Sequence, residues 1–169
     1  EIPLLKQHLC DCLWAMEGQG AQIEQWNRVT GERKQLRPSP SGVTNIEHGF
    51  ATVSRFFSGA RDVLAAIDDD IHFALLGHGF KGKALCFEDQ YLSTGGQLYE
   101  LIMGHDRFVA DLRPLLQPIL KQRGWMPNLC CHPYDLCTEL VAREAGVFIT
   151  NEFGDRLGAP LNVEADVTW

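Results

Sequence analysis

Short apolar-rich segments separated by glycine-containing turns open the chain. Leu9–Ala15 precedes a turn at 17–20, Ala21–Trp26 precedes a turn at 29–32, and a polar segment follows at Arg33–Arg37. Runs of this length between turn residues are typical of β-strands joined in a meander. The pattern therefore predicts a small sheet of strands connected by tight turns.

A proline- and glycine-rich linker ends this meander, and it contains Pro38, Pro40 and Gly42. We therefore expect two parts, a β-meander over residues 1–42 and an α/β subdomain over residues 43–169. The second part opens with Ile46–Phe57, whose β-branched and aromatic residues predict a buried strand.

Apolar residues spaced three and four apart predict helices in the second part. The first covers 59–76 with Ser58 as its cap, and the second is capped by Ser93 or Thr94 and ends near Met103. Further helices are expected at 114–123 and 134–145, strands at 84–87, 108–112, 147–150 and 161–169, and a loop at 77–82. Strands that alternate with helices after a meander indicate an α/β fold, a layered mixed sheet with flanking helices.

Composition narrows the class of protein. Of the 169 residues, 45% are hydrophobic and 22% are charged, which is typical of a folded globular protein. The formal net charge of −7 argues against partners such as nucleic acid or an anionic membrane, because both need a basic face. No apolar run approaches the roughly 18 residues that span a bilayer.

The 6 cysteines form no Cys-x-x-Cys pair and no regular spacing. Reduced, mostly buried thiols in a cytoplasmic protein are therefore expected. A zinc site is the alternative, with Cys130, Cys131, His132 and Cys137 as its ligands. Adjacent cysteines cannot easily point at one tetrahedral metal ion, so the spacing favours buried thiols.

The segment His132–Leu136 carries a carboxylate at the predicted start of a helix. Asp135 can act there as a capping residue, because free N–H groups and the helix dipole favour a negative charge. It can also supply one oxygen to a hard cation such as Mg²⁺. Glu88 and Asp89 offer further carboxylates, although a solvated loop is the better expectation for them. The residues by themselves leave both roles of Asp135 open.

Several segments resemble, in their order, motifs of the inositol monophosphatase family. Leu13–Ala21 is similar to that family's strand and Gly-x-Gly-Ala hairpin, and Ser93–Gly96, with Arg107 further on, is similar to its small-residue helix and Gly-Arg motif. Tyr134–Asp135, followed by Glu144–Gly146, resembles its Trp-Asp and Glu-Ala-Gly signature, with tyrosine in place of tryptophan. The order of the motifs carries the resemblance more than any single motif does.

The resemblance implies a Mg²⁺-dependent hydrolase that acts on a small-molecule phosphomonoester of a sugar, polyol or nucleotide. In that family a metal-activated water attacks the phosphorus. Asp135 would be a metal ligand, and Thr94, Gly95 and Asp111 would contact the substrate. For Thr94 and Gly95 the alternative is an ordinary capped helix that packs closely through its glycines.

The family's Asp-Pro-x-Asp-Gly-Thr metal loop is absent from this sequence. Either the chain is the C-terminal part of a longer phosphatase whose metal-rich N-terminal half is missing, or it is a non-catalytic interaction module on a degenerate phosphatase fold. The apolar-rich start and the end at Trp169 favour the first interpretation, in which the chain alone is inactive. A homodimer is compatible with both.

Overall fold

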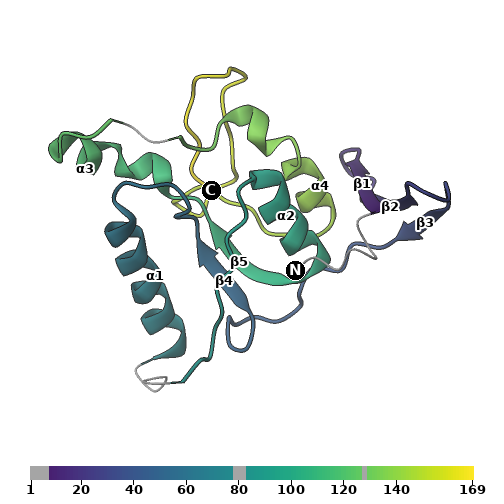
Figure 1. The fold of residues 1–169 in the computed structure, drawn as a ribbon, viewed down its shortest axis with the longest axis horizontal. Coiled ribbons are helices and arrows are strands. Elements are labelled where there is room, and N and C mark those ends of the chain that lie inside the picture. The colour runs from purple at the N-terminus through teal and green to yellow at the C-terminus, as the bar shows by residue number, and fades with distance from the viewer. Residues whose placement is uncertain (1–7, 78–82, 127–128) are drawn as a thin grey trace.

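The computed structural model describes residues 8–77, 83–126 and 129–169 (Figure 1). The elements, in chain order, are β1 (Leu9–Ala15), β2 (Ala21–Asn27), β3 (Arg33–Leu36), β4 (Phe50–Val53), α1 (Arg61–Leu76), α2 (Thr94–Met103), β5 (Asp106–Ala110), η3 (Arg113–Leu116), α3 (Gln117–Gln122), η4 (Pro133–Leu136) and α4 (Glu139–Glu144), where η marks a 3-10 helix. The predicted α/β class is confirmed, but the described strands form a small antiparallel sheet and a separate parallel pair instead of one mixed sheet. Within these described ranges, no helix has both the length and the apolar composition that crossing a membrane requires.

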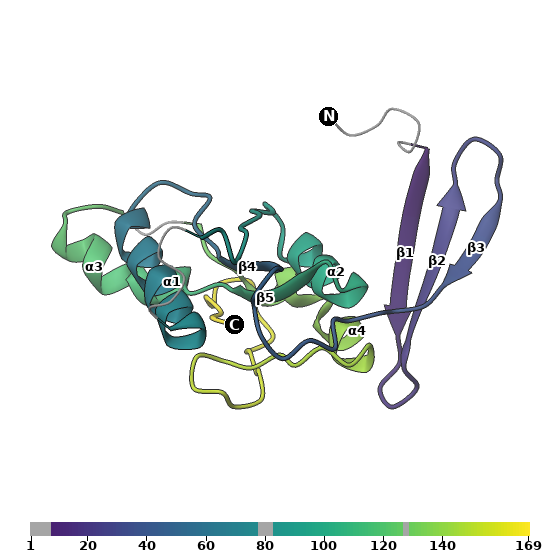
Figure 2. The ribbon, with the colours of Figure 1, turned by 90° about the horizontal axis from the view of Figure 1, so that it is seen from below.

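The predicted strands at the beginning of the described chain are confirmed, and they pair antiparallel in the order β1-β2-β3. Gly18 and Gly20 have φ angles of 75° and 77° in the β1–β2 turn, a conformation that residues with a β-carbon rarely adopt. Ile23 of β2 is buried in one hydrophobic cluster with Leu98 of α2 and Val141 of α4. The meander therefore packs through one face against these two helices, and Figure 2 shows it standing beside the rest of the fold.

β4 and β5 form a parallel pair, and Phe87 adds an isolated parallel bridge to Phe50 of β4. Val53 of β4 packs in a hydrophobic cluster with Leu64 of α1 and with residues of η3 and α3. Val109 of β5 packs in a second cluster with residues of α2 and α4. The helices therefore cover opposite faces of this sheet, α1 and α3 on one face and α2 and α4 on the other (Figure 2).

Both long helices end at the predicted glycines, but only α2 has the predicted cap. Ser93 accepts a hydrogen bond from the Gly96 N–H. α1 instead begins after Ala60, whose backbone is left-handed (φ 51°) and which provides no side-chain cap. The predicted Ser58 cap is therefore wrong, because the chain turns once more before the helix starts.

The predicted helix at 134–145 is divided into η4 and α4. Pro133 occupies the first turn of η4, and the Asp135 carboxylate accepts the His132 N–H at 2.9 Å. This capping contact closes a tight 3-10 turn, and the chain enters α4 only after Thr138.

The predicted strands are shorter than expected. Within 46–57 only β4 is extended, because His48 has a φ of 61° and interrupts the extended backbone before it. Within 84–87 only Phe87 pairs with a strand, through its bridge to Phe50. The predicted loop at 77–82 lies outside the described residues, except for Gly77.

The predicted strands at 147–150 and 161–169 are not regular strands, because their neighbours provide single pairings and no continuous ladder. Thr150 forms one isolated bridge, and at the other end of the segment Trp169 exchanges backbone hydrogen bonds with Asp111 (2.7 and 3.3 Å). The last residues of the chain are thereby held beside the end of β5.

Candidate active site at the carboxyl edge of the parallel strands

The candidate site lies where the parallel strands β4 and β5 end. Ser54 follows β4 and Asp111 follows β5, and the Ser54 N–H donates to the Ala110 carbonyl at 2.8 Å. Both side chains are completely buried. α2 starts beside them, because the Gln97 side-chain amide donates to the Ser54 hydroxyl at 2.7 Å. We call this region the carboxyl edge, and in open α/β sheets it is the place where ligands bind.

The first turn of α2 presents N–H groups at the carboxyl edge. The Ser93 hydroxyl accepts the Gly96 N–H at 3.1 Å, and the Ser93 carbonyl accepts the Gln97 N–H at 3.0 Å. The N–H groups of Thr94 and Gly95 precede these and have no partner within the helix. Together with the helix dipole they favour an anionic or hydroxyl oxygen.

The two glycines of this turn have different roles. A β-carbon at Gly96 would lie 2.9 Å from the Ser93 hydroxyl oxygen, so a side chain there would disturb the cap. A β-carbon at Gly95 would have the Thr138 methyl group as its nearest neighbour, at the ordinary contact distance of 3.8 Å. Gly96 therefore supports the cap, whereas a β-carbon at Gly95 would fit at ordinary contact distance beside Thr138.

The Cys131 thiol lies beside Thr94, one of the predicted site residues. The Thr94 hydroxyl donates to its sulfur at 3.6 Å, and the thiol is almost completely buried. Burial raises the pKa of Cys131 to about 11, and the carboxylates of Asp111 and Asp135 act in the same direction. The fold therefore brings Thr94 into contact with Cys131, 37 residues further along the chain. The thiol stays protonated and is no nucleophile at neutral pH.

Asp111 is engaged by an arginine within the protein. Its carboxylate accepts hydrogen bonds from Arg113 Nε at 2.7 Å and Nη2 at 2.5 Å, and both side chains are buried. Arg113 Nη1 donates to the Leu129 carbonyl at 2.8 Å, and the guanidinium lies 4.6 Å from the centre of the Phe56 ring. The carboxylate of Asp111 thus orders the segment that leads to Cys131, which differs from the direct substrate contact that the resemblance implies.

Asp135 has the capping role that its position predicts. Its Oδ2 atom accepts the His132 N–H at 2.9 Å, and the side chain is half-buried. The His132 ring is itself held, because Nδ1 lies 3.0 Å from the Ala165 carbonyl oxygen and 3.6 Å from a carboxylate oxygen of Asp166. A cation bound to Asp135 would therefore use the other carboxylate oxygen, Oδ1.

No group of three or more His, Cys, Asp or Glu side chains in the described parts of the chain could hold a metal ion. The zinc interpretation is therefore wrong: Cys130 and Cys131 are buried, whereas Cys137 is exposed. The expectation of mostly buried thiols is also wrong, because Cys10 and Cys12 are exposed too and Cys86 is only half-buried. For Mg²⁺, Asp135 would supply one carboxylate, and among the described residues it belongs to no group of three or more such side chains. The described residues do not fit a complete Mg²⁺ site, which needs near-octahedral oxygen coordination.

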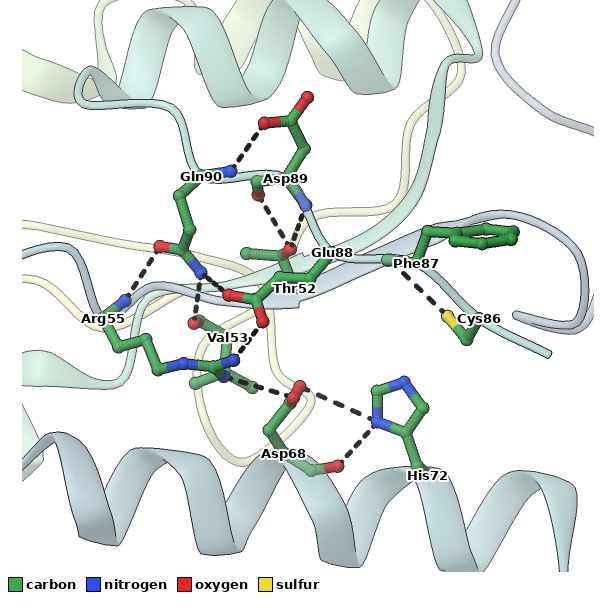
Figure 3. Close-up of polar contacts among 10 residues, drawn as sticks. All are labelled: Thr52, Val53, Arg55, Asp68, His72, Cys86, Phe87, Glu88, Asp89 and Gln90. Carbon is green, nitrogen blue, oxygen red and sulfur yellow. Dashed lines mark hydrogen bonds and ion pairs between the residues drawn. The ribbon is translucent and has the colours of Figure 1, made fainter. Parts of the chain in front are cut away.

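A network of ion pairs and hydrogen bonds holds the loop before α2 against the end of β4 (Figure 3). Arg55 pairs with Asp68 of α1 at 3.2 Å and with Glu88. The Gln90 side chain accepts the Arg55 N–H at 3.1 Å and donates to the Val53 carbonyl at 3.1 Å. Glu88 is therefore an ion-pair partner in an exposed loop, as the solvated interpretation predicts, and the network sets the path by which the chain enters α2.

Two sets of hydrogen bonds connect the meander to helices α4 and α2. The two carboxylate oxygens of Glu144, at the end of α4, accept the N–H groups of Gly18 and Gly20, both at 2.8 Å. These hydrogen bonds lower the pKa of Glu144. The Tyr99 hydroxyl of α2 donates to Asp11 of β1 at 2.5 Å. Two of the segments that carry the family resemblance, the Gly-x-Gly hairpin and the Glu-Ala-Gly segment, are thus in direct contact.

Sequence reasoning missed the residues whose hydrogen bonds and ion pairs connect the segments around the carboxyl edge. An arginine two residues after a strand-ending aspartate, as in Asp111 and Arg113, is a local signal for a bidentate pair. Arg55, Gln90 and Cys131 have no such signal, because their partners come from distant segments.

No family model, no curated protein and no solved structure matches the chain. The likeness to the inositol monophosphatase family is therefore a hypothesis that depends on the motifs and on the geometry described above.

Proposed function

We propose that the chain forms the substrate side of a Mg²⁺-dependent phosphomonoesterase similar to inositol monophosphatase. The observation that carries the proposal is that the first turn of α2 lies beside the ends of β4 and β5, with Thr94 in contact with Cys131. Thr94, Gly95 and Asp111 come from segments that the motif order identified separately, and these segments lie at the carboxyl edge, where ligands of α/β proteins bind.

Each residue has a role in this proposal that its surroundings support. The free N–H groups of Thr94 and Gly95 bind oxygens of a phosphorylated sugar, polyol or nucleotide, and the positive end of the α2 dipole favours the negative charge. Asp111 acts indirectly: its ion pair with Arg113 positions the segment that carries Cys131 and Asp135. We therefore treat Asp111 as a positioning residue.

Mg²⁺ belongs to the proposal through the resemblance alone. Asp135 would supply one oxygen, and the other ligands would have to come from outside the described residues, since these contain no larger group of suitable side chains. We accordingly assign no step of the hydrolysis to the cation. In this proposal Thr94 and Gly95 bind and orient the substrate, and Asp111 positions the neighbouring segment.

The test is an assay of the gene product with Mg²⁺ against a panel of phosphomonoesters, using Asp135→Asn as the variant. Asparagine keeps an acceptor oxygen for the His132 N–H but removes the charge, so the η4 turn should survive while metal-dependent hydrolysis is lost. Asp155→Asn, in an exposed turn, is the matched control. Unchanged hydrolysis in Asp135→Asn would contradict the assignment.

A non-catalytic interaction module on the same fold is the second candidate. It is favoured by the internal pairing of Asp111 and by the lack, among the described side chains, of any group of three or more metal ligands. If the folded gene product hydrolyses none of the phosphomonoesters with Mg²⁺, this second function stands and the first fails.

A further inference from the structure

Two free thiols lie in one row on the outer face of the meander. Cys10 and Cys12 are exposed and are separated by one residue on the regular strand β1. Residues two apart on a strand point to the same side of the sheet. On the neighbouring strand, Cys10 is paired with Trp26 and Cys12 with Glu24. The two sulfurs are therefore adjacent on a surface that also carries an indole ring.

The strand holds these thiols too far apart for a disulfide and at a suitable distance for a shared ion. Two residues of an extended strand span about 6.8 Å, whereas a disulfide needs a Cβ–Cβ distance of about 4 Å. Two thiolates bound linearly to one soft metal ion, with metal–sulfur bonds of about 2.3 Å, put their sulfurs about 4.6 Å apart. Rotation of the two side chains toward each other covers that difference without bending the strand.

The surroundings leave sulfur as the available ligand. Asp11, between the cysteines, points to the inner face, where it accepts hydrogen bonds from Tyr99 at 2.5 Å and from Gln25 at 3.0 Å. The Glu24 carboxylate accepts hydrogen bonds from Gln35 at 3.0 Å and from Arg33 at 3.4 Å. These carboxylates are already engaged, so a hard cation finds no free oxygen ligand next to the thiols.

We propose that Cys10 and Cys12 form a two-coordinate binding site for a soft monovalent metal ion, of which Cu(I) is the biological example. Thiolate ligands select Cu(I) among the first-row metals, and Zn²⁺ needs about four ligands, whereas no third side chain of the described chain completes a larger set here. Binding releases two protons: two thiols and one Cu(I) ion give one Cu(I) bis-thiolate with a net charge of −1, and no electron is transferred.

The other cysteines do not offer such a site. Cys86 is half-buried, has no cysteine near it in the sequence, and donates to the Gly49 carbonyl at 3.3 Å. Cys137 is exposed but has no cysteine within two residues on a strand, and Cys130 and Cys131 are buried. Burial also raises the pKa of both Cys130 and Cys131 to about 11, which opposes formation of the thiolate. Cys137→Ser is therefore the matched control for substitutions on β1.

The experiment is an anaerobic titration of the whole chain with Cu(I) in the presence of a competing chelator. We expect one Cu(I) per chain, with loss of tryptophan fluorescence because the ion lies beside Trp26. Cys10→Ser and Cys12→Ser should each lose the site to the chelator, whereas Cys137→Ser should bind like the wild type. All three substitutions are at exposed positions, and unchanged circular dichroism spectra would establish that the variants are folded.

Binding that persists in the Cys10→Ser, Cys12→Ser double variant would overturn the proposal. A stoichiometry of one Cu(I) per two chains, accompanied by dimerisation in size-exclusion chromatography, would also overturn it, because the site would then lie between chains. X-ray absorption that finds nitrogen or oxygen beside the ion would exclude the two-sulfur geometry. None of these results depends on phosphatase activity.

Discussion

Asp111 gives the sharpest test of the distinction between a positioning residue and a substrate ligand. Its carboxylate and the Arg113 guanidinium are 0% and 7% exposed, and they share two hydrogen bonds of 2.7 and 2.5 Å. Asp111→Asn keeps the size of the side chain but leaves the guanidinium buried without a counter-charge. Breaking a buried pair in this way costs about 3–5 kcal/mol, compared with about 0–1 kcal/mol for an exposed pair.

The assay is urea unfolding of the wild type, Asp111→Asn, Arg113→Met and the double variant. We expect each single variant to lose about 3–5 kcal/mol of unfolding free energy, a large part of the roughly 5–15 kcal/mol of a typical domain. The double variant should lose less than the sum, because it no longer contains an unpaired charge. Glu17→Gln, which breaks the exposed pair with Arg156, is the control and should cost at most about 1 kcal/mol.

A loss of less than about 1 kcal/mol in Asp111→Asn would refute this reasoning. The carboxylate would then be replaceable within the fold, and the direct substrate contact implied by the family resemblance would regain support. Additive losses in the double variant would likewise show that the two side chains act independently.

Three further predictions concern the α2 cap, a buried carboxyl and the hairpin contact. Gly96→Ala should lower the thermal midpoint more than Gly95→Ala, because only the former brings a β-carbon to 2.9 Å from the Ser93 hydroxyl; equal effects would contradict the packing. Burial raises the pKa of Asp106 to about 6, so between about pH 4 and pH 6 the folded chain holds a proton that the unfolded chain releases. The unfolding free energy should therefore fall as the pH rises from about 4 to about 6. Urea unfolding at several pH values should show a weaker fall in Asp106→Asn, and an identical slope would be evidence against it. Glu144→Gln should increase hydrogen exchange at the Gly18 and Gly20 amides. Because the pKa of Glu144 is lowered, the wild type should lose the same protection as the pH falls through that pKa. Unchanged exchange in the variant would exclude the contact.

The elements with local signals could be predicted from the sequence. The meander strands are bounded by turns, and α2 has a serine cap before it and a glycine after it, so neighbouring residues determine these limits. The break between η4 and α4 was missed because the capping contact of Asp135 closes the turn after Pro133. A helical pattern of apolar residues does not reveal such a contact.

The candidate site could be predicted only in part. The motif order draws attention to Thr94, Gly95 and Asp135; in the structure Thr94 contacts Cys131, and Asp135 caps the η4 turn. The pairing of Asp111 with Arg113 does not follow from the family resemblance, which assigns Asp111 a substrate contact and says nothing of the arginine two residues further on. Contacts such as that of Arg55 with Asp68 depend on the path of distant segments, which no local pattern contains.

The most direct test of the proposed function is the backbone amide shift of Thr94 and Gly95 in nuclear magnetic resonance spectra during titration with glycerol phosphate. If the first turn of α2 binds the phosphomonoester, these two amides should shift with a saturating dependence on concentration, and unphosphorylated glycerol should have a much smaller effect. Amides that do not move, in a chain whose spectrum shows it to be folded, would contradict the proposed substrate site.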